Sequence, residues 1–249
     1  MAKPPIGRLY VIPNTLGGVA PGAVLPEATL AVARRLSHFV AETPKLARAF
    51  LKSIDTPHPI QSIRIAEMSE HTPNESVAAL LKPALDGGDL GLISDAGCPG
   101  IADPGALLVA AAHDAGVVVV PLPGPSAILL ALMASGMDGQ RFVFHGYLPA
   151  KTGARAAAIR TLDAATVRDG ATQIFIETPY RNDAMLSALL EHAGGRSRLC
   201  VAADLTTATE LVRSERIEQW RSRAPLDLGG RPAVFLIGRD AQAIPRRRS

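Results

Sequence analysis

Short apolar runs rich in β-branched residues alternate along the chain with longer segments in which apolar positions recur every three or four residues. The short runs predict buried strands, and the longer segments predict helices that cover them. In the first half the pattern predicts strands at 8–12, 38–42, 89–94 and 117–122, and helices at 27–39, 74–85 and 106–115. This alternation favours an α/β fold with a parallel sheet.

The alternation begins again after the segment "PLPGP" at 121–125. Strands are predicted at 141–148, 172–177, 198–204 and 233–238, and helices at 126–136, 153–168 and 182–193, while 210–220 fits either type. A cluster of proline and glycine between two such patterns is typical of a domain junction. We therefore expect two α/β domains, residues 1–121 and 122–249.

Composition narrows the class of protein. The 249 residues are 47% hydrophobic and 20% charged, which is typical of a globular chain. No apolar run is long enough to cross a bilayer, and the first residues lack the pattern of a signal peptide. Cys98 and Cys200 match no metal-binding spacing, so we expect no metal site. Two thiols without an export signal favour the cytoplasm.

Charge is distributed unevenly. Residues 1–121 hold 9 basic and 11 acidic residues, a net charge of −2, whereas residues 122–249 hold 17 and 12, a net charge of +5. A basic second half is suited to a polyanion such as RNA. A solvated surface together with the tail "RRRS" accounts for the same numbers, so charge alone leaves both interpretations open.

Three loops rich in glycine or proline follow predicted strands, at 12–18, 93–105 and 121–127. In open α/β sheets, ligands bind at the carboxyl ends of strands, so these loops are the candidate site. None of them has the dinucleotide-binding, P-loop or nucleophile-elbow pattern. These absences argue against a dehydrogenase, a P-loop enzyme and an α/β hydrolase.

Four motifs together carry a resemblance to a known family: "SDAGCPGIADPG" (94–105), "PLPGPSA" (121–127), "FHGYLPAK" (144–151) and "IETPYR" (176–181). In this order and spacing they resemble the tetrapyrrole methylase superfamily of S-adenosylmethionine-dependent methyltransferases. The closest likeness is to its branch of ribosomal RNA small subunit (cytidine-2'-O)-methyltransferases. The resemblance covers roughly residues 8–239.

The resemblance implies two α/β domains of the tetrapyrrole methylase type, with S-adenosyl-L-methionine bound in the cleft between them. Glycines in 94–105 would let backbone amides and carbonyls approach the cofactor closely. For Asp95 a loop-capping turn is the alternative role, and Asp103 is expected to form such a turn. The implied cofactor-binding residues are Leu16, Asp95, Ala96, Gly97, Ile101, Ala102, Ser126, Ala127, Glu177 and Leu205.

The chain departs from the family on the expected substrate side. Residues 41–45 read "AETPK" where the ribosomal RNA enzymes usually carry "AEDTR". Glu42 remains and is a candidate catalytic base, with a structural pairing to Arg48 as the alternative. Arg181 is the second candidate catalytic residue because it can hold a phosphate, and a plain surface arginine is its alternative.

The sequence therefore predicts methyl transfer from S-adenosylmethionine to an oxygen of ribosomal RNA. Two alternatives stay open: methylation of a tetrapyrrole or other small molecule, and a non-catalytic relative that binds the cofactor or RNA. The family implies a homodimer, and we expect no membrane partner. For RNA, the basic second half is expected to contribute Lys151, Arg155 and Arg181 near the cleft mouth, with Arg160 on the helix of the first two.

Overall fold

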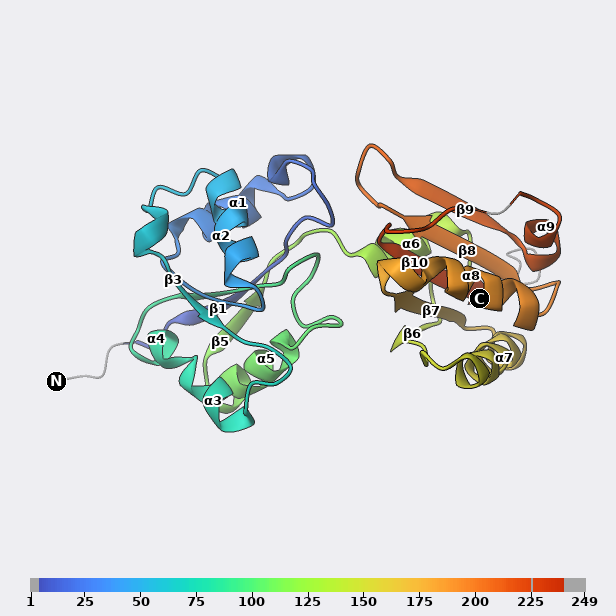
Figure 1. Ribbon diagram of the computed structural model, residues 1–249. Coiled ribbons are helices and arrows are strands. Elements are labelled where there is room, and N and C mark those ends of the chain that lie inside the picture. The colour runs from blue at the N-terminus through green and yellow to red at the C-terminus, as the bar shows by residue number, and fades with distance from the viewer. Residues whose placement is uncertain (1–4, 225, 240–249) are drawn as a thin grey trace, which may run out of the picture. The chain divides into compact units, whose positions relative to one another are not determined.

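The computed structural model describes residues 5–224 and 226–239, and its chain divides into two compact units (Figure 1). Unit 1 is residues 1–126 and unit 2 is residues 127–249. The division lies at the far end of the Pro/Gly segment, whereas the predicted boundary stood at its start, after residue 121.

Unit 1 is built on a five-stranded sheet in the order β3-β2-β4-β1-β5. All of its pairings are parallel, which confirms the predicted parallel sheet. The strands are β1 (Arg8–Ile12), β2 (His38–Ala41), β3 (Arg64–Glu67), β4 (Leu90–Ile93) and β5 (Val118–Pro121).

Helices pack on both faces of this sheet (Figure 1). On one face, α1 (Glu27–Arg35) and α2 (Pro44–Ser53) contribute to a core with Ile12 and Phe39. On the other, α3 (Asn74–Ala79), α4 (Lys82–Leu85) and α5 (Gly105–Asp114) enclose Leu9 and Val40. Short 3-10 turns lie at η1 (Pro21–Ala23) and η2 (Ile60–Ser62).

Two predicted helices of unit 1 are shorter than expected, and two elements were missed. The helix predicted at 27–39 ends at Arg35, where Leu36 turns to an extended backbone. The helix predicted at 74–85 is split into α3 and α4, because Pro83 has no N–H to continue the hydrogen-bond ladder. Strand β3 and helix α2 had not been predicted.

Unit 2 contains a second five-stranded sheet, in the order β6-β7-β10-β8-β9. Its strands are β6 (Phe142–Tyr147), β7 (Thr172–Glu177), β8 (Arg198–Ala203), β9 (Leu211–Arg216) and β10 (Ala233–Gly238). Only β6 and β7 pair in parallel, and the other three pairings are antiparallel. The repeated strand–helix pattern therefore predicted strands correctly here, but a wholly parallel sheet would be wrong.

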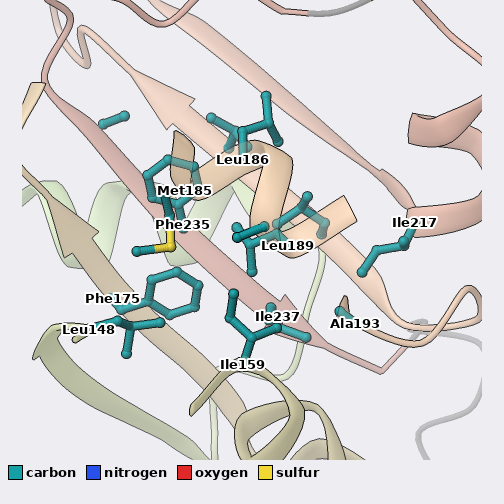
Figure 2. Close-up of a cluster of buried hydrophobic side chains, with 14 of the residues drawn as sticks. Leu148, Ile159, Phe175, Met185, Leu186, Leu189, Ala193, Ile217, Phe235 and Ile237 are labelled. Carbon is teal, nitrogen blue, oxygen red and sulfur yellow. The ribbon is translucent and has the colours of Figure 1, made fainter. Parts of the chain in front are cut away.

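The core of unit 2 lies between this sheet and helices α7 (Thr152–Asp169) and α8 (Asn182–His192) (Figure 2). Phe175 and Phe235 stack at its centre with ring centroids 5.8 Å apart. The ambiguous segment 210–220 is strand β9 followed by α9 (Ile217–Arg221), whose Trp220 Nε1 donates to the Leu199 carbonyl at 3.0 Å. Helix α6 (Ala127–Ser135) and the turn η3 (Pro179–Arg181) complete the unit.

The strand order determines where the candidate loops lie. In unit 1, β2, β4 and β1 are neighbours in a parallel sheet, so the loops that follow them emerge at one edge. In unit 2, β7 and β8 end, and β10 begins, at one edge, since Glu177 and Ala203 both pair with Ala233. Among the described residues, none of the helices is both long and apolar enough to span a membrane.

The phenylalanine stack predicts a strong dependence of unit 2 on Phe235, which is fully buried. Phe235→Ala is expected to lower the free energy of unfolding by about 3–5 kcal/mol, because it removes the ring and leaves a cavity. Phe142→Ala is the control, since Phe142 is 41% exposed on β6, and should cost much less. Urea titration monitored by circular dichroism measures both, and equal losses would contradict this account of the core.

Candidate functional site

The glycine loop, residues 94–105 after β4, is held by polar contacts at its start. Buried Asn14, in the loop after β1, donates from Nδ2 to the carbonyls of Ser94 (3.2 Å) and Asp95 (3.3 Å). The Asn14 N–H also donates to the Gly97 carbonyl at 2.9 Å. Ser94 Oγ donates to that same carbonyl at 2.8 Å. The loop conformation is thus fixed by the neighbouring strand end.

The remainder of the glycine loop has an uncommon backbone. Gly97, Gly100 and Ala102 have φ values of +67°, +81° and +61°. Such angles suit glycine, and for Ala102 they store strain. Asp103 Oδ1 accepts hydrogen bonds from the N–H groups of Gly100 (2.6 Å) and Gly105 (2.7 Å), which confirms its predicted role as a turn-former. Burial raises the pKa of Asp103, while these two bonds oppose the rise.

Asp95 bonds across to the loop after β2 instead of capping its own loop. Its Oδ2 accepts from Thr43 Oγ1 at 2.6 Å, and its Oδ1 accepts from the Thr43 N–H at 3.1 Å. Thr43 is one of the departures from the family motif, and its role had been missed. The sequence offered one signal for this contact. Thr43 and Asp95 each follow a predicted strand, and a short hydroxyl side chain can donate to a carboxylate at a neighbouring strand end.

Glu42 precedes Thr43 and is exposed. Partial burial raises the pKa of its carboxyl, and the nearby charges of Asp95, Asp103 and Glu70 raise it further. In the part of the chain that the structure describes, Glu42 and Arg48 form no ion pair, so the alternative pairing of Glu42 with Arg48 was wrong. Glu42 therefore remains in contact with solvent, while its partly buried carboxyl has a raised proton affinity.

The other predicted residues of unit 1 fall around the glycine loop, except those at the unit boundary. A Cβ added to Gly97 would lie 3.1 Å from Leu16 Cδ2. Ala96, Ile101 and Ala102 are exposed, and therefore accessible to a ligand. Ser126 is buried and is the last residue of unit 1, and Ala127 begins α6 in unit 2.

In unit 2, Glu177 ends β7 with its side chain completely buried. Its Oε1 accepts from Arg181 Nη2 (2.6 Å) and Nε (3.0 Å) and from the Thr178 N–H (2.7 Å). Its Oε2 is buried without a hydrogen-bond partner. Arg181 also stacks over the Tyr180 ring at 5.6 Å, so much of its guanidinium is already engaged within the unit.

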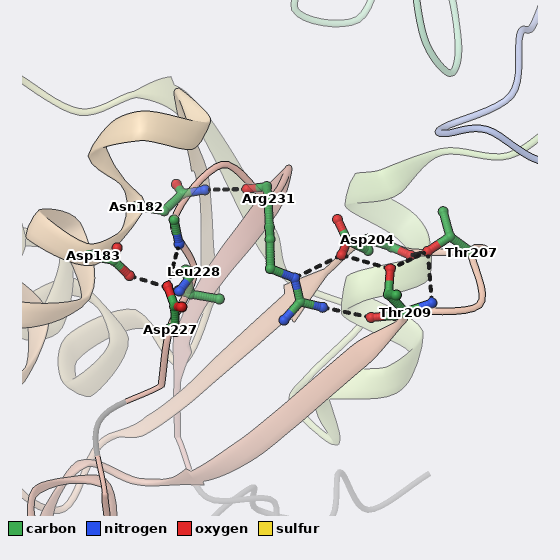
Figure 3. Close-up of polar contacts among 9 residues, drawn as sticks. Asn182, Asp183, Asp204, Thr207, Thr209, Asp227, Leu228 and Arg231 are labelled. Carbon is green, nitrogen blue, oxygen red and sulfur yellow. Dashed lines mark hydrogen bonds and ion pairs between the residues drawn. The ribbon is translucent and has the colours of Figure 1, made fainter.

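The loop after β8 carries Leu205, which is buried, and lies at the same sheet edge (Figure 3). Arg231 holds this loop: its Nε is 2.7 Å from Asp204 Oδ2, and its Nη2 donates to the Thr209 carbonyl at 2.6 Å. Asn182 Nδ2 in turn donates to the Arg231 carbonyl at 2.6 Å. This network, which sequence reasoning missed, leaves Asn182 Oδ1 and Thr206 Oγ1 buried without partners.

The basic residues expected at the mouth of the site do not form one surface. Arg155 is buried, with its Nε unpartnered, so its predicted contact with RNA was wrong. It falls on the stripe of α7 that packs inward, together with Ile159 and Leu162. Lys151 and Arg160 are exposed.

These observations test whether S-adenosylmethionine fits the residues present. The glycine loop offers backbone that a side chain at position 97 would obstruct. Unit 2 offers buried acceptors, Glu177 Oε2 and Asn182 Oδ1, that lack donors, as amino and hydroxyl groups of a nucleoside would supply. Each unit by itself therefore has groups that suit part of the cofactor: open backbone in unit 1 and hydrogen-bond acceptors in unit 2. Residues 5–224 and 226–239 contain no cluster of three metal-ligating side chains.

Comparison with known proteins agrees with this geometry. The family model described as "Tetrapyrrole (Corrin/Porphyrin) Methylases" matches residues 23–220. The chain is 35% identical over 213 residues to "Ribosomal RNA small subunit methyltransferase I" of Mesorhizobium japonicum, covering 86% of this chain and 68% of that relative. A protein of the same name from Xylella fastidiosa is 32% identical, covering 93% and 80%.

Solved structures show the same fold at lower identity. The methyltransferase CobJ superimposes with a TM-score of 0.63 at 18% identity, covering 98% of this chain and 97% of that one. Uroporphyrin-III-C-methyltransferase from Thermus thermophilus gives a TM-score of 0.54 at 18% identity, covering 95% and 94%. The two α/β units, the glycine loop and the match over residues 23–220 have one explanation: the chain belongs to the tetrapyrrole methylase family.

Proposed function

We propose that the chain transfers a methyl group from S-adenosyl-L-methionine to a ribose 2'-oxygen of small-subunit ribosomal RNA, in the cytoplasm. The observation that carries the proposal is the glycine loop, whose start is held by Asn14 and Thr43 and whose backbone is left-handed at Gly97 and Gly100. Relatives that share about a third of their residues with this chain are named as methyltransferases of that RNA, which supports the choice of acceptor.

Backbone groups of Ala96, Gly97, Ile101 and Ala102 are proposed to hold the cofactor in unit 1. Leu16, Ser126, Ala127, Leu205 and Glu177 complete the proposed set, with Glu177 Oε2 as an acceptor. S-adenosylmethionine supplies a methyl group activated by a sulfonium. Asp95 is proposed to position the glycine loop against the loop after β2, because both of its carboxylate oxygens accept hydrogen bonds from Thr43.

Glu42 is proposed as the base that accepts the proton of the acceptor hydroxyl. The residue is accessible to solvent, and the raised pKa of its carboxyl makes it a stronger base than an ordinary glutamate. Arg181 is proposed to orient Glu177 through their two hydrogen bonds, and its remaining N–H groups are available to a phosphate.

The direct test is transfer of a radiolabelled methyl group. Total RNA and small-molecule extracts are offered separately as acceptors, and labelled RNA is digested to nucleosides. A 2'-O-methylated nucleoside from small-subunit RNA supports the proposal. Label in a small molecule, or binding without transfer to either pool, would replace it with one of the two alternatives.

Gly97 gives a prediction about cofactor affinity. Gly97→Val is expected to weaken S-adenosylmethionine binding at least tenfold, because the new side chain meets Leu16 and strains a φ of +67°. Gly116→Val is the control, since Gly116 has a φ of +71° with open space around it. Calorimetry measures both. Absence of binding by the unaltered chain, or equal affinities in both variants, would refute this site.

Glu42 gives a prediction about pH. A base must be ionised, so the rate should rise with pH through the raised pKa of Glu42, with a midpoint above the ordinary glutamate value of about 4.3. Glu42→Gln should lower kcat by about 10²–10⁴-fold and remove this limb of the profile. Glu75 is exposed in the first turn of α3, and Glu75→Gln should change neither kcat nor the pH profile.

The raised pKa of Glu42 also determines how its ionisation changes the free energy of unfolding with pH. Because folding raises the pKa of Glu42, ionised Glu42 disfavours the folded state as pH rises above the unfolded value. Glu42→Gln should therefore melt no lower than the unaltered chain at neutral pH. A lower melting temperature would attribute lost activity to unfolding rather than to a missing base.

A homodimer is the proposed assembly, as the family resemblance implies. Exposed apolar side chains support it: Met133, 78% exposed, and Leu129, 49% exposed, lie one turn apart on α6. Light scattering should give twice the chain mass of 26.1 kDa. Met133→Glu should shift this mass toward the monomer, and a monomer mass at all concentrations of the unaltered chain would contradict the proposal.

A further inference from the structure

Helix α2 carries three basic residues and no acidic residue in the sequence "PKLARAFLKS". Lys45, Arg48 and Lys52 are spaced three and four residues apart, so they share one face of the helix. All three are exposed, and within the described ranges none of them forms an ion pair. On α1, by contrast, Arg34 pairs with Glu27, and Arg35 with Asp89.

The opposite face of α2 is fixed in the core of unit 1. Ala47, Phe50 and Leu51 are buried, and the two larger side chains belong to the cluster that includes Phe39 and Ile93. Figure 1 shows α2 beside α1 in this unit. The apolar side of the helix is therefore occupied, and the basic side is presented to solvent in a rigid orientation.

The position of α2 links this face to the proposed base. The helix begins at Pro44, two residues after Glu42. Thr43, the residue between them, uses its hydroxyl on Asp95 rather than to cap the helix. The first turn of α2 is thus tied to the glycine loop, and Lys45 to Lys52 extends roughly 10 Å away from it along the helix axis.

We propose that Lys45, Arg48 and Lys52 form a phosphate-binding surface, the α2 basic face, that holds the acceptor RNA beside Glu42. The inference rests on the proposed function and deepens it. Unpaired cations at this spacing suit successive phosphates of an RNA strand. A membrane surface fits less well, since Leu46 is the only large apolar side chain exposed on the described helix.

The test is the salt dependence of RNA binding, with small-subunit ribosomal RNA as the probe. The triple variant Lys45→Ala, Arg48→Ala, Lys52→Ala should reduce the slope of log K against log salt by about 2, at about 0.7 for each phosphate contact to a single strand. The variant Lys45→Arg, Arg48→Lys, Lys52→Arg retains the charges and should retain the slope. Cofactor affinity should be unchanged in both.

A matched control removes three exposed cations elsewhere in unit 1: Arg8→Ala, Arg64→Ala, Lys82→Ala. Arg8 and Arg64 are the first residues of their strands, at the sheet edge opposite the glycine loop. Its slope should match that of the unaltered chain. Equal reductions in both alanine triples would overturn the inference, because they would show a general charge effect.

Other outcomes separate this inference from the function on which it rests. An unchanged slope in the α2 triple, with RNA methylation intact in the unaltered chain, overturns the α2 basic face alone. Cofactor binding without RNA binding by the unaltered chain overturns the RNA acceptor and this surface with it. An unchanged RNA slope with lost binding to phosphatidylserine vesicles assigns the face to membranes instead.

Discussion

The hydrogen bonds between Asp95 and Thr43 are the contact on which the candidate site of unit 1 depends. They join the loop after β4 to the loop after β2, and Asn14 joins the loop after β1 to the same backbone. Three separate chain segments are thereby held at one sheet edge. Loss of either partner would leave a carboxylate or its donors unsatisfied in a partly buried place, at a cost of about 1–3 kcal/mol.

These hydrogen bonds explain how the glycine loop keeps a strained backbone conformation. The left-handed backbone at Gly97 and Gly100 costs little, whereas at Ala102 it costs free energy that neighbouring contacts must offset. Asp103 supplies two of those contacts by accepting from Gly100 and Gly105. A loop fixed before ligand arrives loses less conformational entropy on binding. The same bonds also set the position of Glu42 and the start of α2.

Unit 2 uses a different means to present its polar groups. Glu177 is buried and neutralised on one oxygen by Arg181, while its other oxygen has no partner. Arg231 fixes the loop after β8 through Asp204 and Thr209. Buried acceptors without donors are costly in a folded chain, and the cofactor proposed for this chain has amino and hydroxyl groups that would satisfy them. Arg181 therefore neutralises and orients the buried Glu177 carboxylate, which a plain surface arginine would not do.

The sequence by itself determined four strands of each unit, the parallel sheet of unit 1, the glycine loop and the family, because these follow from local periodicity and from motifs that are contiguous in the chain. It missed β3, a four-residue edge strand with polar ends, and it did not reveal that β8, β9 and β10 pair antiparallel. Pairing direction depends on segments far apart in the chain, which local patterns do not record. Only the tertiary structure decided that Arg155 is buried whereas Lys45, Arg48 and Lys52 are exposed, and that Thr43 bonds to Asp95. The side of a helix that faces the core is set by what packs against it, and a hydrogen bond across two loops exists only once their strands are neighbours.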